Sequence, residues 1–531
     1  DDENTTSTSS HQNTTFFPHF DTLNLERLPC LKRIDGEEFS WSRRDKISSN
    51  ITNTVHDDLQ SAQVTASYWS LCQYPRKISI SFCDSLSSLI PWYAVGQMKR
   101  LQELIIRDCE TMMEVFENEL MNNTNNNVDE GSGVGTSLTS LPLKNSTTVV
   151  VPQFSNLNIV CIYKCDLLPH IFTFSTLKTL SHLKVLKVKR CRTIQVIVKE
   201  ENETSPKVVV FPRLETLELD GLPNLKGFFL GMIDFKCPSL VNVMINDCDE
   251  WRVFTSGELE TPKLKYAHTS LGKHILEHGF NFQTTFPTSS DLTISKGMPS
   301  SFHNLIEINV ENIDVGTIII PSNALLQLEK LQQITIVKCV VIHEVFEVAA
   351  LEGTNKSQTV VKIPNLTQVE LSWVYGLKYL WKSNKWMVLE FPKLRTLSIN
   401  SCKSLEYVFT CSMVGSLVLL QDLSIEWCTN LEVIVKEEEE EEECDVKVNE
   451  IMLPRLNSLK LGNLPNLKGF CLGKKAFSLP ALDTLQIKEC PTMTLFTKGH
   501  LSTPKLKEID ASFGMFDVRT DLNSFIEAKQ E

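Results

Sequence analysis

A nine-residue pattern of apolar and polar positions recurs along the chain, as in LETLELDGL at 214 and LDTLQIKEC at 482. An apolar residue is followed by two variable positions and by two apolar residues that alternate with polar ones. A cysteine or another apolar residue closes the pattern. Alternation with a period of two predicts a short strand with one buried and one exposed face. Copies of the pattern begin at residues 101, 183, 214, 240, 331, 366, 394, 420, 456 and 482.

Successive patterns start at intervals such as 26 residues, from 394 to 420 and again from 456 to 482. This period is typical of leucine-rich repeats, in which each repeat buries its apolar side chains against its neighbours. The expected fold class is an α/β solenoid, a leucine-rich-repeat horseshoe with a concave parallel β-sheet and an irregular or short-helical convex side. On the convex side, Leu222, Leu225 and Phe228 fall at every third position, which predicts a tight helical turn after the strand.

The chain also contains a larger duplication. Residues 211–231 (FPRLETLELDGLPNLKGFFLG) and 453–473 (LPRLNSLKLGNLPNLKGFCLG) are identical at 14 of 21 positions, at an offset of 242. Upstream the offset is 237, as between Cys165 and Cys402. The five additional residues of the second copy lie around a run of glutamates, whose mutual repulsion predicts a solvated loop.

The repeats and their interruptions predict a division of the chain into segments. Asn, Gly and Ser are frequent in the stretch that precedes the first copy of the duplication, and the repeat pattern weakens between the two copies. The expected segments are 1–16 (disordered N-terminal segment), 17–120 (leucine-rich repeats), 121–151 (low-complexity insertion), 152–270 (block A), 271–300 (irregular joint), 301–510 (block B, with an acidic loop at 436–450) and 511–531 (C-terminal tail).

The formal net charge of the chain is −13, and no domain-sized basic patch is present. We therefore expect neither nucleic acid nor an anionic membrane as a partner. No apolar run approaches 18 residues, so no membrane span is expected. The first residues lack the basic flank and the apolar stretch of a signal peptide. Because the sequence does not begin with Met, we expect it to be a piece of a longer protein.

Nine of the 16 cysteines close the repeated pattern or a variant of it. Equivalent positions in stacked repeats lie in a row, which favours buried thiols in the reduced state. Reduced thiols indicate a cytoplasmic location rather than a secreted protein. These cysteines are Cys83, Cys109, Cys165, Cys191, Cys248, Cys339, Cys402, Cys428 and Cys490.

Known catalytic motifs are missing from the sequence. It contains no P-loop, no G-x-S-x-G nucleophile elbow and no C-x-x-C pair that would indicate a zinc module. One motif, HILEH at 274–278, matches the H-x-x-E-H pattern of some zinc peptidases. On a helix, His274 and His278 could share a metal ion with a nearby carboxylate, and Glu277 completes the motif. The duplicated block has Phe516 in place of His274, so a zinc hydrolase is a minor alternative to a non-catalytic protein.

The two copies of the 21-residue segment differ mainly beside the strand. Glu218 becomes Lys460, whereas Asn224 and Lys226 on the return segment are unchanged in the second copy. Variation on one exposed face indicates a working surface, and repeat proteins commonly bind partners where their strands pair. Free drift of exposed residues is the alternative. The predicted protein-binding residues are Arg107, Asp108, Lys187, Lys189, Arg190, Glu218, Asp220, Asn246, Asp247, Lys338, Glu370, Trp373, Asn400, Glu426, Trp427, Lys460, Lys488 and Glu489.

Two tryptophans, Trp373 and Trp427, occupy the same position of the pattern, two strands apart with Ser401 between them. Their separation is expected to be about 10 Å, because adjacent strands lie about 4.8 Å apart. Exposed tryptophans are favoured anchors of protein interfaces. The alternative is that each ring packs on neighbouring side chains.

Longer stretches resemble a known family. The series FPRL-x-x-L-x-L-x-x-LPNLKGF, P-S-L-x-x-V-x-I-x-x-C and TPKLKYAHTSLGKH is similar to the carboxyl-terminal repeat region of plant nucleotide-binding leucine-rich-repeat (NBS-LRR) resistance proteins. The coiled-coil class is closest, in particular the lettuce resistance-gene-candidate type. The resemblance extends over residues 17–510.

This resemblance implies a non-catalytic, cytoplasmic region that acts in plant defence. It would recognise a pathogen effector or a guarded host protein, and it would help to hold a nucleotide-binding domain in its closed state. No nucleotide-binding motif is present here, so ATP or ADP would bind a domain outside these residues, and no cofactor is expected in this chain. A substrate adaptor for ubiquitin ligation is the alternative binding protein.

Overall fold

The computed structural model describes most of the repeats. The described residues are 20–34, 74–90, 98–116, 154–177, 179–201, 208–276, 302–312, 318–347, 359–382, 387–437, 450–512, 514–517 and 522–528. The expected N-terminal segment, the low-complexity insertion and most of the acidic loop lie outside these residues.

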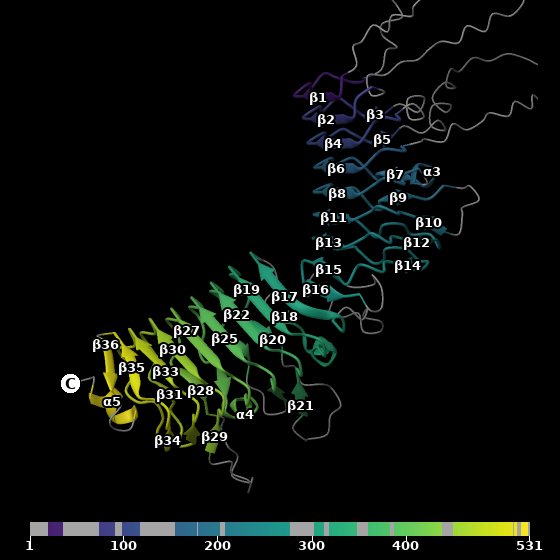
Figure 1. Ribbon diagram of the computed structural model, residues 1–531. Helices are drawn as coiled ribbons and strands as arrows, with labels where there is room; N and C mark the ends of the chain where they lie inside the picture. The colour runs from purple at the N-terminus through teal and green to yellow at the C-terminus, as the bar shows by residue number, and fades with distance from the viewer. Residues whose placement is uncertain are drawn as a thin grey trace, which may run out of the picture. The chain divides into compact units, whose positions relative to one another are not determined.

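The chain divides into two compact units. Unit 1 contains Asp1–Val241 with Val253–Lys263, and unit 2 contains Asn242–Arg252 with Leu264–Glu531. Both units consist of a ladder of strands, most of them five residues long, on one side and of shorter strands on the other (Figure 1).

Unit 1 has a ladder of six parallel strands that pair without a change of register. From β2 onward, the second and fourth side chains of each strand are buried and the others face outward, whereas in β1 the second and fourth side chains are half-buried. The strands, in order, are β1 (Thr22–Glu26), β2 (Lys77–Ser81), β4 (Glu103–Arg107), β6 (Ile159–Tyr163), β8 (Val185–Lys189) and β11 (Thr216–Asp220).

Unit 2 contains a longer ladder, parallel in most of its pairs. Among the described strands, β15–β16, β16–β17 and β35–β36 pair antiparallel. The strands are β13 (Asn242–Asn246), β15 (Tyr266–Thr269), β16 (Gly272–Ile275), β17 (Leu305–Glu311), β19 (Gln333–Val337), β22 (Gln368–Ser372), β25 (Thr396–Asn400), β27 (Asp422–Glu426), β30 (Ser458–Gly462), β33 (Thr484–Lys488), β35 (Glu508–Ala511) and β36 (Gly514–Asp517).

All ten sequence patterns are confirmed as ladder strands, and the residues expected in the core are buried. Leu217 and Leu459 are both fully buried. Each apolar row packs against the rows of the neighbouring repeats, as the solenoid requires. The described cysteines are thiols, and the nine that close the pattern are buried, as predicted.

The return side of the repeats differs in detail from the turns that the sequence predicts. Gly469–Cys471, in the second LPNLKGF segment, is a short strand. The expected tight turn precedes this strand, because the Leu225 N–H donates to the Leu222 carbonyl oxygen at 3.0 Å and the Leu467 N–H to the Leu464 carbonyl oxygen at 3.3 Å. Parallel neighbours then pair with the strand in the adjacent repeats, which the sequence did not predict. The return-side strands are β3 (Ser88–Ile90), β5 (Glu114–Phe116), β7 (Phe172–Thr173), β9 (Val198–Lys199), β10 (Val208–Val210), β12 (Asp234–Lys236), β14 (Leu259–Glu260), β18 (Ile318–Ile320), β20 (Glu344–Phe346), β21 (Thr359–Lys362), β23 (Tyr379–Trp381), β24 (Met387–Glu390), β26 (Phe409–Thr410), β28 (Val433–Lys436), β29 (Glu450–Met452), β31 (Gly469–Cys471), β32 (Ala476–Ser478) and β34 (Leu501–Ser502).

Helices are few and short among the described residues. They are α3 (Phe174–Leu177), the 3₁₀-helix η5 (Ser322–Gln327), α4 (Cys411–Val414) and α5 (Leu522–Ala528). The segment expected as a C-terminal tail contains both β36 and α5, and the segment expected as an irregular joint begins with β16.

The duplication is visible element by element. The series from β6 to β16 in the chain recurs as the series from β25 to β36, including the short helices α3 and α4. Ring geometry recurs as well, because Phe228 stacks on Phe254 at 4.5 Å and Phe470 stacks on Phe496 at 4.6 Å. The two copies therefore fold in the same way, including their buried contacts.

One core difference between the copies is compensated. Phe229 contacts Phe174, with ring centroids 5.6 Å apart. The second copy has Cys471 and Cys411 at these two positions, and a hydrogen bond between the two side chains lowers the pKa of the Cys471 thiol to about 7. The mismatch at position 229 is thus one half of a paired exchange in the core.

Candidate functional site

The residue that follows nearly every ladder strand has a left-handed backbone. Trp373 has a φ of 57° and Trp427 a φ of 60°. Their N–H groups donate to the carbonyl oxygens of Asn400 and Gly462 in the next repeat, both at 2.9 Å. This conformation costs a non-glycine residue about 1 kcal/mol, and here the repeat geometry imposes it at nearly every strand end. The predicted residues at such positions are Asp108, Arg190, Asp247, Lys338, Trp373, Trp427 and Glu489.

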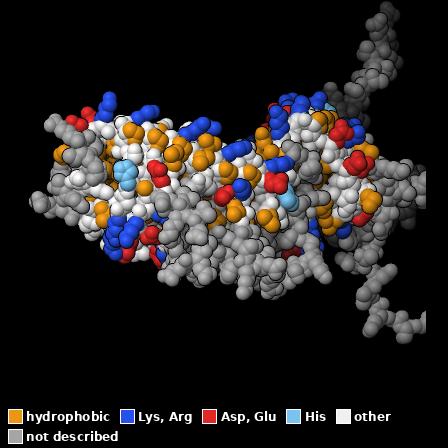
Figure 2. Space-filling view, turned by 90° about the horizontal axis from the view of Figure 1, so that it is seen from below, with side chains coloured by type: hydrophobic (Ala, Val, Ile, Leu, Met, Phe, Trp, Pro, Cys, Tyr) orange, Lys and Arg blue, Asp and Glu red, His pale blue; other side chains and the backbone are white. Residues whose placement is uncertain are grey.

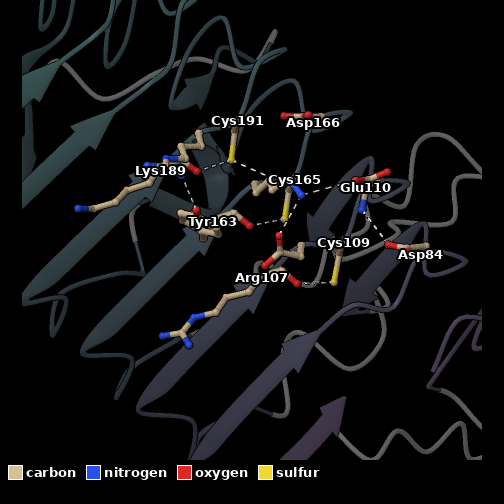
Figure 3. A network of polar contacts seen from close by, with 12 residues as sticks. Asp84, Arg107, Cys109, Glu110, Tyr163, Cys165, Asp166, Lys189 and Cys191 are labelled. Carbon is tan, nitrogen blue, oxygen red and sulfur yellow. Dashed lines mark hydrogen bonds and ion pairs between the residues drawn. The ribbon is translucent and has the colours of Figure 1, made fainter. Parts of the chain in front are cut away.

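The cysteine that follows this left-handed residue fixes the end of the strand. The Cys109 thiol donates to the Arg107 carbonyl oxygen at 3.3 Å, and the Cys191 thiol donates to the Lys189 carbonyl oxygen at 3.3 Å (Figure 3). Burial raises the pKa of the Cys109 thiol to about 12, so this thiol remains protonated and can donate. The cysteine row therefore binds the backbone of the same repeat in addition to filling the core.

The remaining predicted residues occupy outward positions of the ladder strands. The structure thus brings all the predicted residues of each unit to the ladder face of that unit, although their role in binding remains a prediction. The residues in the strands are Arg107, Lys187, Lys189, Glu218, Asp220, Asn246, Glu370, Asn400, Glu426, Lys460 and Lys488.

Several charged residues of unit 1 bind one another across the strands. Lys187 lies opposite Glu218 with 2.8 Å between Nζ and Oε2, and Lys189 contacts both Glu218 and Asp220. Burial of the Glu218 carboxyl opposes its ionisation, but hydrogen bonds from the two ammonium groups outweigh this effect and lower its pKa. These charges stabilise the ladder, so they present less charge to a partner than the sequence suggests.

Tyr163 is a surface residue that the sequence reasoning missed. It faces outward from β6, and its hydroxyl accepts a hydrogen bond from Arg190 Nη1 at 2.9 Å. The Arg190 guanidinium also lies 5.6 Å from the centroid of the Tyr163 ring. The repeat LNIVCIYKC begins at Leu157 and fits the nine-residue pattern, so the signal for this strand was present in the sequence.

On the ladder face of unit 2, small polar side chains surround two exposed tryptophans, in contrast to the charged pairs of unit 1. Trp373 is 44% exposed and Trp427 is 53% exposed. The outward side chains of the strands between and beside them are mostly small and polar, which leaves the indole rings as the largest groups of this area. These small residues are Ser372, Ser398, Asn400, Ser401, Ser424 and Ser458, with Gly462 at the end of β30.

On the return side, Asn224 and its counterpart Asn466 form equivalent hydrogen bonds to the preceding repeat. The Asn224 side-chain amide donates to the Arg192 carbonyl oxygen at 2.7 Å, and Asn466 donates to the Thr429 carbonyl oxygen at the same distance. Each asparagine therefore joins its repeat to the preceding one. This bond explains why they are identical in the two copies, so their identity is not evidence that the ladder face is a binding surface.

The side chains on the side of the molecule drawn in Figure 2 are mixed in character. Lys and Arg side chains lie beside Asp and Glu side chains, with hydrophobic side chains between them. Among the described residues, no helix is both long and apolar enough to cross a membrane.

The possible zinc motif is not on a helix where the structure describes it. His274 belongs to the strand β16, is fully buried, and has its Nε2 atom 2.9 Å from the Thr269 hydroxyl oxygen. Successive strand residues point to opposite faces, so the one-face helical spacing assumed for the motif does not apply here. Glu277 and His278 lie outside the described residues. In the described part of the chain, no cluster of three metal-ligating side chains is present.

Comparison with known families gives a broad match. The family model of RPS2-like plant disease resistance proteins, leucine-rich repeats, matches residues 46–149, 143–256, 289–429 and 415–501, which is more than half of the chain.

Two relatives come from Arabidopsis thaliana. The probable disease resistance protein At1g12290 is 30% identical over 114 residues, which are 22% of this chain and 12% of the relative. The probable disease resistance protein At4g27220 is 27% identical over 134 residues, 24% of this chain and 14% of the relative. The matched stretches thus span less than a sixth of the length of either relative.

Solved structures give weaker similarity. The TLR13–ssRNA13 complex has 12% identity and a TM-score of 0.29, with 78% of this chain and 50% of that chain covered. The plant peptide hormone receptor RGFR1 in complex with RGF2 has 13% identity and a TM-score of 0.16, with coverages of 81% and 79%.

Proposed function

The chain belongs to the leucine-rich-repeat family of plant disease resistance proteins, and we propose that it is the non-catalytic protein-recognition region of a cytoplasmic plant immune receptor. The partner would be a pathogen effector or a host protein that the receptor guards. The coiled-coil class of NBS-LRR receptors is part of the proposal. Family membership supports a role in defence, and the ladder face supplies a surface for binding.

The exposed tryptophan pair carries the proposal for the binding surface. Trp373 and Trp427 extend from strand ends whose backbone is fixed by hydrogen bonds to the next repeat. A rigid aromatic group loses little conformational entropy on binding, so it is an effective anchor for a protein partner. The small residues between the rings would let a partner approach the backbone closely.

Restraint of the receptor is the second part of the proposal. A partner that binds the active state more tightly than the resting state shifts the population toward signalling. The repeats would therefore hold a nucleotide-binding domain at rest until a partner binds, and ATP or ADP would bind that domain rather than these residues.

The two other candidate functions have less support. The family match does not favour a substrate adaptor for ubiquitin ligation. A zinc hydrolase would require His274 to reach a metal ion, and this side chain is fully buried beside Thr269.

The test is a pair of substitutions in the plant's own gene, Trp373→Ala and Trp427→Ala. The expected result is loss of the pathogen-dependent defence response, with protein abundance and melting temperature unchanged, because the two side chains are exposed. The readouts are ion leakage from challenged leaves and thermal unfolding of the purified chain.

Met232→Ala is the matched control, because Met232 is 84% exposed and lies on the return side between Leu230 and β12. It should leave the response intact. If Met232→Ala abolishes the response and both tryptophan variants retain it, the ladder face is not the recognition surface.

A further inference from the structure

A shallow depression of about 460 Å³ lies in unit 2, at the turns that follow four successive ladder strands. These strands are β22, β25, β27 and β30. Lys378, Lys403 and Thr429 line the depression, and each of them comes from a different repeat. The depression is therefore built by the stacking of repeats, and its chemistry depends on the residues at the turns.

In the first copy of the duplication, an aspartate occupies the position of Lys403. Asp166 accepts the Arg192 N–H on its Oδ1 atom at 3.2 Å, and its Oδ2 atom lies 3.8 Å from Arg192 Nε. In the same way, Asp84 accepts the Glu110 N–H at 3.4 Å (Figure 3). An aspartate directly after the cysteine thus supplies a carboxylate to the turn of the next repeat.

The second copy keeps the turn but lacks this acceptor. Thr429 is the equivalent of Arg192, and its carbonyl oxygen accepts the equivalent asparagine bond, from Asn466 at 2.7 Å. Among the described residues, no atom accepts the Thr429 N–H, because Lys403 stands where the aspartate would be. The turn therefore presents a backbone donor at the place where the first copy holds a carboxylate.

The lysines of the depression add positive charge to this donor. In the described part of the chain, no carboxylate forms an ion pair with Lys378 or Lys403. Lys403 Nζ lies 5.0 Å from the centroid of the Tyr375 ring, which positions the ammonium group without neutralising it. Glu406 also lines the depression, but burial and a hydrogen bond to its carboxylate raise the pKa of Tyr379 to about 12, so this carboxylate already has a donor.

We propose that this depression binds a side-chain carboxylate from an acidic segment of a partner protein. The carboxylate would accept the Thr429 N–H and would pair with the ammonium groups of Lys378 and Lys403. The choice of a carboxylate follows from Asp166, which fills the equivalent place in the first copy.

This inference shares with the proposed function only the premise that the chain binds a protein. The two tryptophans do not line the depression, and a peptide titration does not use the defence response. Either proposal can therefore fail without the other.

The probe is the peptide GSDSG with blocked ends, and GSNSG, which lacks the carboxylate, is its matched control. The full chain carries an ¹⁵N label at threonine, and Thr429→Ser identifies the amide resonance of Thr429. GSDSG should shift this resonance in a saturable way, because the N–H gains a charged acceptor. GSNSG should bind at least tenfold more weakly, since its amide carries no charge. Added salt should weaken the binding of GSDSG.

Lys403→Asp tests the site by restoring the arrangement of the first copy. The new carboxylate should accept the Thr429 N–H, so the affinity for GSDSG should fall at least tenfold while the melting temperature does not decrease. Lys505→Asp makes the same change of charge at an exposed position before β35 and should keep the affinity. Lys378→Gln removes one ammonium group and should weaken binding about threefold.

Several outcomes would overturn the proposal. They are an unchanged Thr429 resonance up to the solubility limit of GSDSG, equal affinity for GSNSG, and unchanged affinity in folded Lys403→Asp. An equal loss of affinity in Lys505→Asp would show that only the net charge of the chain matters. Tighter binding of inorganic phosphate than of GSDSG would identify a phosphate group as the ligand, which also contradicts a carboxylate.

Discussion

Single residues at the strand ends have separable roles in this protein. The cysteine of the repeat donates to a backbone carbonyl oxygen two residues earlier, as Cys428 does to Glu426 at 3.4 Å. The residue before it adopts the left-handed conformation and projects its side chain from the ladder face, as Trp427 does. The N–H of the left-handed residue donates to the next repeat both where a cysteine follows, as at Trp427, and where a valine follows, as at Trp373, so its side chain can vary without a change of fold.

Buried thiols elsewhere in the core lead to a pH prediction. Burial raises the pKa of the Cys237 thiol to about 12, whereas an unfolded thiol titrates near about 8.5. The folded state thus holds its proton more tightly, so stability is complete below about pH 8.5 and is lost as the pH rises toward about 12. Each such thiol lowers the free energy of unfolding by about 1.4 kcal/mol per pH unit in this window.

Urea unfolding followed by tryptophan fluorescence at about pH 8 and about pH 10 measures this loss. Cys237→Ala should remove the contribution of one thiol, so the loss of stability between the two pH values becomes smaller. The same loss in both proteins would contradict the assignment of a raised pKa to this thiol.

At the scale of elements, the duplication explains which insertions the fold tolerates. The connection from β9 to β10 runs from Lys199 to Val208, and the equivalent connection from β28 to β29 runs from Lys436 to Glu450. The second connection is longer by the five residues that the sequence offset reveals. The strands on both sides nevertheless keep equivalent pairings, with β10 on β12 and β29 on β32.

Deletion of residues 439–443 should therefore leave stability unchanged within about 0.5 kcal/mol, because it restores the length that the first copy already uses. The measurement is the free energy of unfolding in urea. The matched control deletes five residues from the return segment, 464–468, which removes buried Leu464 and Leu467 and should unfold the repeat. A large loss of stability on the glutamate deletion would contradict the equivalence of the two connections.

The sequence predicted those elements whose side chains alternate in an obvious way. LETLELDGL identifies β11 because leucine occupies each buried position, whereas YAHT and GMFD of β15 and β36 lack leucine and were missed. The left-handed residues could not be predicted, since their side chains range from Phe82 to Glu489 and the backbone conformation comes from the repeat. Cross-strand ion pairs such as Lys187–Glu218 require the register between repeats, which one sequence does not give.

At the scale of the whole molecule, each repeat is stabilised mainly by its two neighbours. The ladder pairs join adjacent repeats, and the return-side strands do the same. Stability in such an array is approximately a sum of repeat and neighbour contributions, so damage in one place need not spread along the chain. This property would let the ladder face change in one repeat while the rest of the chain stays folded.

Leu217→Asp tests this property. Leu217 is fully buried in β11 of unit 1, and an aspartate there would be a charge without a partner in the core, at a cost of about 4 kcal/mol. Hydrogen exchange measured by mass spectrometry should show loss of protection in β8 and β11, whereas peptides from β30 and β33 of unit 2 should keep theirs. Glu215→Gln, at an exposed position directly before the same strand, is the control and should leave protection in both regions. Loss of protection throughout the chain would show that the array unfolds as one cooperative unit, and an unchanged exchange pattern in β11 would contradict the burial of Leu217.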